Sequence, residues 1–198
     1  ASVEKREPDY KVIKDIATEC FMPLCYGGGI TNTEQIKKIF GIGVEKISII
    51  TSAIDKPALI SEAAAAFGSQ AIIASIDVKK SFWGKYEVMK NKGSKSIGRD
   101  PVSFAKEMEK AGAGEILLTS VDREGTWEGY DIELLIQVKS AVKIPVIVNG
   151  GAGSMQHLEE AKKNGHASGL AIGSMAVYQK NGMGVLINFP GRPELEKI

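Results

Sequence analysis

The sequence is poor in the features that mark secreted, membrane and nucleic-acid-binding proteins. It has only two cysteines, Cys20 and Cys25, too few for a disulfide framework, so we expect a reducing, cytoplasmic location. No run of apolar residues approaches the roughly 20 that cross a bilayer. The 25 basic residues are balanced by 24 acidic ones, which argues against a partner held by bulk charge, such as a nucleic acid or a membrane surface.

Motifs for metals and cofactors are also absent. The two histidines, His157 and His166, are not spaced with the cysteines as metal ligands, and the sequence has no P-loop, dinucleotide fingerprint or Ser-His-Asp arrangement. We therefore expect neither a metal nor a cofactor. The composition, 43% hydrophobic and 25% charged, is that of an ordinary globular protein, and its 22 glycines gather in short runs.

Short apolar runs alternate with amphipathic stretches of helical length, which predicts one α/β domain over residues 1–198. The near-continuous hydrophobicity of the runs is typical of parallel strands covered on both faces. Two helix starts are signalled by the capping-box pattern Thr31-x-x-Glu34 and by Asp100-Pro101. We predict strands at 21–26, 46–51, 71–77, 115–121, 145–149 and 169–173, and helices at about 8–19, 32–42, 56–67, 101–112, 131–141 and 155–164, with a further turn after residue 174.

An internal repeat decides between an open sheet and a barrel, because six strand–helix units suit either. Residues 26–30 recur as 149–153 and residues 49–52 as 172–175, both with a shift of 123, and residues 1–6 resemble 119–123 with a shift of 118. Two copies of a half-barrel predict a TIM (β/α)8 barrel with six of its eight units present.

The strand that ends at Asp77 has no upstream copy, and its counterpart would fall before residue 1. We therefore expect the first strand, first helix and second strand of the barrel to lie outside these 198 residues. Six strands cannot close a barrel, so we expect this piece to be inactive by itself.

The repeat also predicts two anion sites. A glycine run follows one strand in each half and precedes a helix, where backbone N–H groups favour negative charge. A second loop, one unit further round, adds a hydroxyl in each half. The pair predicts a substrate with a phosphate at each end, and the alternative is that the glycines only form tight turns. The candidate phosphate ligands are Gly28, Gly29, Thr51, Gly150, Gly151, Gly173 and Ser174.

Asp77 ends an apolar strand at the mouth of the predicted barrel. Burial there raises a carboxyl pKa and suits general acid/base catalysis; a structural Asp that caps the loop is the alternative. Thr119 and Gly125, on and after the next strand, are candidates for binding substrate, although Thr119 fits a core position equally well. Residues 79–99 carry seven cations and one acid, Glu87, which predicts either a basic hairpin over the mouth or a solvated hairpin.

Several of these motifs together resemble the cyclase subunit of imidazole glycerol phosphate synthase, an enzyme of histidine biosynthesis. The likeness covers nearly the whole chain and is more specific than that to the sister phosphoribosyl isomerase. It is strongest at residues 114–120 followed by Asp122-Arg123. The other segments that carry it are residues 1–6, 27–30, 67–70, 75–77 and 150–153.

The resemblance implies a heterodimer with a glutaminase subunit, which docks on the bottom of the barrel and releases ammonia into it. At the top, ammonia converts a bis-phosphorylated ribulosyl aminoimidazole-carboxamide intermediate to imidazole glycerol phosphate and aminoimidazole carboxamide ribotide. Asp77 matches one catalytic aspartate of the family, and the other belongs to the first strand. Lys46 and Glu115 match two charged residues at the ammonia entrance.

Three positions depart from the family pattern: Ile50 replaces Asn, Asn149 replaces Ser and Glu124 replaces Asp. Residues 20–26 and 185–190 resemble a paralogous branch that accompanies surface-polysaccharide genes and delivers ammonia for sugar amidation. That branch stays open as an alternative. So does a barrel that binds phosphate and docks a glutaminase without turnover. Ile50 favours both alternatives over histidine synthesis.

Overall fold

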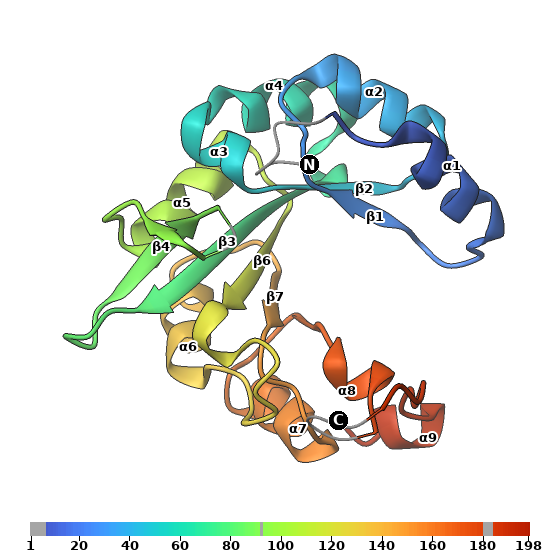
Figure 1. Cartoon of the computed structure of the whole chain (residues 1–198). Coiled ribbons are helices and arrows are strands. Elements are labelled where there is room, and N and C mark those ends of the chain that lie inside the picture. Colours follow the sequence, from blue (N-terminus) through green and yellow to red (C-terminus); the bar gives the residue numbers. More distant parts are fainter. Residues whose placement is uncertain (1–6, 92, 180–183) are drawn as a thin grey trace.

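The computed structural model describes residues 7–91, 93–179 and 184–198. Six parallel strands form a curved sheet in the order β1-β2-β3-β6-β7-β8, and helices cover its convex side (Figure 1). This confirms the predicted α/β barrel class. The parallel strands are β1 (Cys25–Gly27), β2 (Lys46–Ile49), β3 (Ile72–Lys80), β6 (Glu115–Ser120), β7 (Val146–Asn149) and β8 (Gly169–Leu170).

The helices alternate with these strands as the periodicity predicted. The main ones are α1 (Tyr10–Glu19), α2 (Thr33–Gly41), α4 (Ala58–Phe67), α5 (Pro101–Ala111), α6 (Ile132–Lys139) and α7 (Met155–Lys163). Short helical segments are α3 (Thr51–Asp55), η1 (Ser69–Ala71), η2 (Val121–Arg123), α8 (Ser174–Val177) and α9 (Arg192–Leu195). Within the described ranges, no helix is long and apolar enough to cross a membrane.

Local sequence chemistry sets the ends of these helices. Asp100 caps α5 by accepting a hydrogen bond from the Ser103 N–H at 2.8 Å, and Gly112 ends that helix in the left-handed region with φ 102°. The cap of α2 lies one residue later than predicted. Asn32 accepts from the Gln35 N–H at 2.9 Å, and the Gln35 side chain reaches back to the Thr31 N–H at 2.8 Å. Asn32 has the extended φ/ψ typical of a cap residue, and the reciprocal side-chain bond comes from Gln35 rather than from the predicted Glu34.

The core lies between the convex face of the sheet and the helices. Alternate strand residues such as Ile47, Ile72, Ile76, Ile116 and Leu118 are fully or almost fully buried there. Their neighbours along each strand therefore face the hollow of the sheet, because successive side chains point to opposite faces.

A hairpin extends β3 beyond the sheet. Strand β4 (Tyr86–Lys90) pairs antiparallel with residues 77–80 of β3, and β5 (Lys95–Ser96) pairs with β4. Along the same edge of β3, residues 72–74 pair with β2, so β4 lies beyond the end of β2. The basic segment is thus a hairpin as predicted, but it stands beside the mouth rather than over it, and its tip points away from the hollow (Figure 1).

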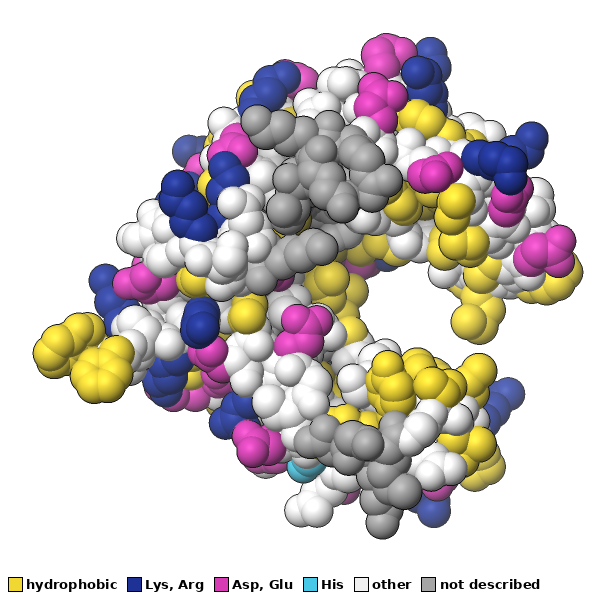
Figure 2. Space-filling model, in the orientation of Figure 1, with side chains coloured by type: hydrophobic (Ala, Val, Ile, Leu, Met, Phe, Trp, Pro, Cys, Tyr) yellow, Lys and Arg dark blue, Asp and Glu magenta, His cyan; other side chains and the backbone are white. Residues whose placement is uncertain are grey.

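The sheet is open between β1 and β8 in the described residues. Figure 2 shows a deep gap on this side, with apolar side chains on both lips. The predicted strand 21–26 is largely wrong here: Phe21 and Met22 are 99% and 74% exposed, and pairing begins only at Cys25. Pro23 has no N–H to donate to a ladder.

Candidate functional site

Three strands carry a line of polar side chains along the hollow of the sheet. Strand register and alternation put Lys46 and Ser48 of β2, Ser75 and Asp77 of β3, and Glu115 and Thr119 of β6 on this face. The line begins at the amino ends of the strands, which we call the bottom, and ends at the carboxyl ends, the mouth.

A charged pair occupies the bottom of this line. Lys46 opens β2 and Glu115 opens β6, and their side chains form an ion pair that spans the intervening strand β3. Glu115 is only 18% exposed. Cys25 lies opposite Lys46 on β1; burial raises its thiol pKa, and the nearby Lys46 and Glu115 charges pull that pKa in opposite directions.

Two hydroxyls lie midway along the line. The side chains of Ser48 and Ser75 hydrogen-bond to one another across β2 and β3. Ser75 is buried. A hydroxyl both donates and accepts, so this pair offers polar contacts between the charged bottom and the mouth.

Asp77 stands at the mouth with two polar neighbours in register. Thr119 lies directly opposite on β6, and Asn149 of β7 donates from its Nδ2 to the Thr119 Oγ1 at 3.2 Å. Burial, reinforced by the negative charge of Glu124, raises the pKa of Asp77 from 3.8 to about 6. A carboxyl that titrates near neutral pH can exchange protons with a substrate.

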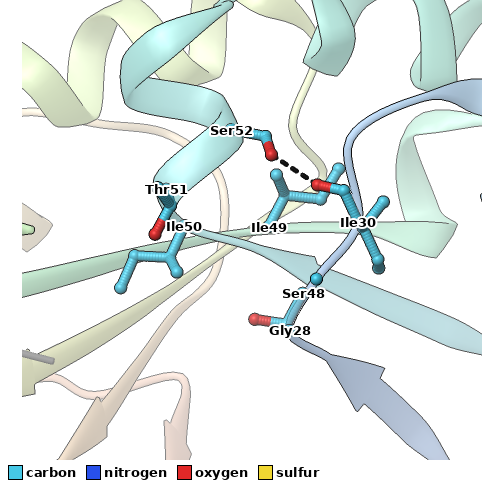
Figure 3. A pocket seen from close by; sticks show the side chains of 8 residues that line it. Gly28, Ile30, Ser48, Ile49, Ile50, Thr51 and Ser52 are labelled. Atoms are coloured by element: carbon cyan, nitrogen blue, oxygen red, sulfur yellow. Dashed lines mark hydrogen bonds between the residues drawn. The ribbon is translucent and has the colours of Figure 1, made fainter. Parts of the chain in front are cut away.

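The first glycine loop leaves a small recess beside the end of β2. Gly28 and Gly29 have φ of 113° and 73°, and a Cβ on Gly28 would meet nothing within 4 Å. The recess is shallow, with a cavity volume of only about 10 Å³, and it is also lined by residues 48–52. In Figure 3 the Ser52 hydroxyl points to the Ile30 carbonyl, to which it donates, while the Ile50 side chain lies beside Thr51.

The second glycine loop is tightly packed. Gly150 and Gly151 also have positive φ, 96° and 102°, but a Cβ on Gly151 would lie 2.1 Å from the Gly129 carbonyl oxygen. By backbone conformation this pair corresponds to Gly28 and Gly29, which lie 122 residues earlier. The shift is one residue less than the 123 that the sequence motif indicated. Packing alone therefore requires glycine in this loop.

The second pair of loops does preserve the repeat. Ile50 (φ −120°, ψ −75°) precedes α3 and Gly173 (φ −122°, ψ −89°) precedes α8, at the predicted shift of 123. Thr51 and Ser174 are the first residues of these two short helices. A Cβ on Gly173 would meet nothing within 4 Å.

Gly125 lies in the loop after β6, with φ 74° and open space around it. This loop is tied to the hairpin, because Asp122 accepts from the Lys80 N–H at 2.8 Å and lies 3.7 Å from the Lys79 Nζ. Two of the predicted mouth cations are thus partly neutralised by ion pairs: Lys79 with Asp122, and Lys80 with Glu133 at 3.1 Å.

Sequence reasoning missed three side chains around the mouth. His157 lies beneath the second glycine loop, and its Nδ1 accepts from the Gly153 N–H at 3.2 Å. Tyr130 donates to the Ala171 carbonyl at 2.9 Å, and Tyr86 donates to Asp131 at 2.9 Å. Spacing could not reveal the two tyrosines, because their partners lie 41 and 45 residues away. His157 is only four residues from Gly153, but that spacing has no chemical signature of its own. Among the residues that the structure describes, no group of three or more His, Cys, Asp or Glu side chains could hold a metal ion.

Comparison with known proteins agrees with this architecture. A family model described as histidine biosynthesis protein matches residues 1–182. A protein of Pseudomonas aeruginosa is 43% identical over 99% of this chain and 78% of its own length. One of Leptospira interrogans is 44% identical over the whole chain and 78% of its own length. Both carry a provisional name as a subunit of imidazole glycerol phosphate synthase. The chain belongs to the histidine biosynthesis protein family.

Proposed function

We propose that the protein is the cyclase-type subunit of a glutamine amidotransferase. It would use ammonia from a glutaminase subunit to form imidazole glycerol phosphate and aminoimidazole carboxamide ribotide from the bis-phosphorylated ribulosyl intermediate. The observation that carries this proposal is the polar line in the hollow of the sheet, from Lys46 and Glu115 through Ser48 and Ser75 to Asp77. Barrel interiors are normally filled with branched apolar side chains, as Ile73 and Leu117 are on this same face. Polar side chains at three successive levels among them suit a small polar molecule.

Each level of the line has a task in this proposal. The ion pair at the bottom lies where ammonia would enter, and the two serine hydroxyls can accept and donate hydrogen bonds to it on its way. At the mouth, ionised Asp77 accepts the proton that the attacking nitrogen loses. Thr119 and Asn149 bind a substrate hydroxyl.

The substrate phosphates would bind at the loops on either side. Gly28 and Thr51 line the first recess, and Gly173 with Ser174 forms the equivalent corner of the other half. Both corners leave the space that a backbone–phosphate approach needs.

The test compares two ammonia sources with the full-length chain and its glutaminase partner. Turnover of the intermediate is measured with added ammonium and, separately, with glutamine. Asp77→Asn should abolish both. Lys46→Met should lower the ratio of glutamine-driven to ammonia-driven turnover at least about tenfold. Lys11→Met, which removes an exposed lysine paired with Asp15 on α1, is the control and should leave the ratio unchanged. Full activity of Asp77→Asn would refute the proposal.

One observation favours a second function, ammonia delivery to a sugar acceptor. Ile50 places an apolar side chain beside Thr51, where the first recess is lined (Figure 3). Ile50→Asn would separate the two functions: a large gain of cyclase turnover indicates a cyclase that has drifted, and no gain indicates the sugar-amidating branch. Tight binding of the intermediate without turnover in either variant would indicate a barrel that binds phosphate but has no cyclase activity.

A further inference from the structure

Strand β4 forms the side of the mouth next to Asp77. In the antiparallel register Met89 is directly opposite Asp77, and Glu87 is opposite Lys79. Directly opposed residues share a face of the sheet, with Cβ atoms about 5 Å apart. Met89 therefore lies on the mouth side beside Asp77, and it is only 6% exposed.

The other face of the hairpin base is fixed by the core. Val78 and Val88, the next pair along, are both fully buried and belong to the main hydrophobic core. The side on which Met89 lies is thus decided by packing, and a slip of one residue would bring Val78 and Val88 out of the core.

Two sets of contacts hold β4 in place. At one end, the Lys90 Nζ lies 2.7 Å from the Asp55 Oδ2 of α3. At the other, the Tyr86 hydroxyl donates to Asp131 at 2.9 Å and lies 3.2 Å from Glu133. The strand is therefore fastened to the elements that follow β2 and β6, on both sides of Asp77.

We propose that Met89 is a positioning residue that keeps water from Asp77, and that the Lys90–Asp55 and Tyr86–Asp131 contacts hold it there. This rests on the proposed function for its catalytic meaning, because the protonation of Asp77 matters to turnover only if Asp77 exchanges protons with the substrate.

The charged groups that face Asp77 come from β3, β4, the loop after β6, and the bottom of β2 and β6. Lys79 of β3 and Glu87 of β4 lie two residues nearer the hairpin tip, and Lys79 is close to Asp122. Glu124 lies in the loop after β6. Glu115, paired with Lys46 of β2, lies two levels below. A neutral substitution of Met89 changes none of these charges, so its effect on Asp77 reports hydration alone.

The test follows the titration of Asp77 directly, by carboxyl carbon NMR on the full-length chain. Met89→Gln keeps the length of the side chain but admits water, and should lower the midpoint of Asp77 from about 6 by about one pH unit. Met89→Leu is the control and should keep the midpoint. An unchanged midpoint in folded Met89→Gln overturns the proposal.

A second variant tests the fastening without touching Met89. Tyr86→Phe removes one hydroxyl and no charge, and should lower the midpoint in the same direction. Tyr130→Phe, which removes the hydroxyl bonded to the Ala171 carbonyl, is the matched control and should not. An equal change in both variants would overturn the role of the fastening.

The pH profile of ammonia-driven turnover then connects the two proposals. If the midpoint of Asp77 moves in Met89→Gln and the kcat/KM profile moves with it, both hold. A midpoint that moves while no variant turns over the intermediate refutes the proposed function and leaves the role of Met89 intact.

Discussion

Replacing Asp77 by Asn should stabilise the protein at alkaline pH while it removes activity. The pKa of Asp77 is raised from 3.8 to about 6 in the folded state. Its ionisation therefore costs folding free energy, at about 1.4 kcal/mol for each tenfold change in the ionisation constant, or about 3 kcal/mol in all. Solvent still reaches this half-buried side chain, and screening reduces the value to about 1–2 kcal/mol.

The sign of the pH dependence follows from the direction of the pKa change. A carboxyl that binds its proton more tightly when folded contributes stability below about pH 4, and that contribution is lost as the pH rises through 6. Urea unfolding of the full-length chain should therefore show Asp77→Asn more stable than the parent at pH 8, by about 1–2 kcal/mol, with a much smaller difference at pH 4.

A surface carboxylate provides the control. Asp15→Asn removes an exposed group that pairs with Lys11 on α1 and should change stability by less than about 0.5 kcal/mol at either pH. A destabilised Asp77→Asn at pH 8, or an equal gain at both pH values, would show that burial is not what raises the pKa.

Three further predictions follow from the same contacts. Gly151→Ala should lower the free energy of unfolding in urea by more than about 2 kcal/mol, because its Cβ would lie 2.1 Å from the Gly129 carbonyl oxygen. Gly28→Ala has open space around its Cβ, so it should lower the free energy of unfolding by only about 1 kcal/mol and mainly raise KM. Equal losses in the two variants would contradict this. The rate of turnover, divided by the concentration of un-ionised ammonia, should decrease as the pH is lowered below 6, because Asp77 then takes up its proton. A flat profile from pH 5 to 8 would exclude Asp77 as the proton acceptor. Asp131→Ala and Asp9→Ala each remove a helix cap, at a cost of about 1 kcal/mol. Asp131→Ala should be the more destabilised of the two, because Asp131 also accepts a hydrogen bond from the Tyr86 hydroxyl. Similar urea midpoints for the two variants would argue against that contact.

The succession of strands and helices could be predicted because burial imposes its period on the sequence. Residues that pack under a helix are apolar in three of the predicted runs, 46–51, 115–121 and 145–149. The structure has strands β2, β6 and β7 in these runs. The prediction extended β2 to Thr51 because Ile49 and Ile50 are both β-branched. The strand ends at Ile49, and Thr51 begins a helix. Apolar character therefore located the strands but could not show where the chain turns out of the sheet.

The site was predictable where a residue's place follows from its strand. Asp77 and Thr119 lie at the carboxyl ends of neighbouring parallel strands, and the structure places them in register. Met89 could not be found in this way, because its position depends on an antiparallel register that the sequence of the hairpin does not specify. The same holds for Tyr86 and Asp131, which are 45 residues apart.

The two halves of the repeat use their glycines differently, and this bears on what the duplication means. Gly28 opens onto space beside Thr51, whereas Gly150 and Gly151 are pressed against the Ser120 and Gly129 carbonyls. A duplicated motif is therefore not, by itself, evidence for two ligand sites, since one copy is explained by packing. The corner that can still receive a second phosphate is formed by Gly173 and Ser174, where the backbone repeats the conformation of Ile50 and the space is open. If the substrate carries two phosphates, loss of binding should follow substitution at Gly173 rather than at Gly151, where loss of folding should come first.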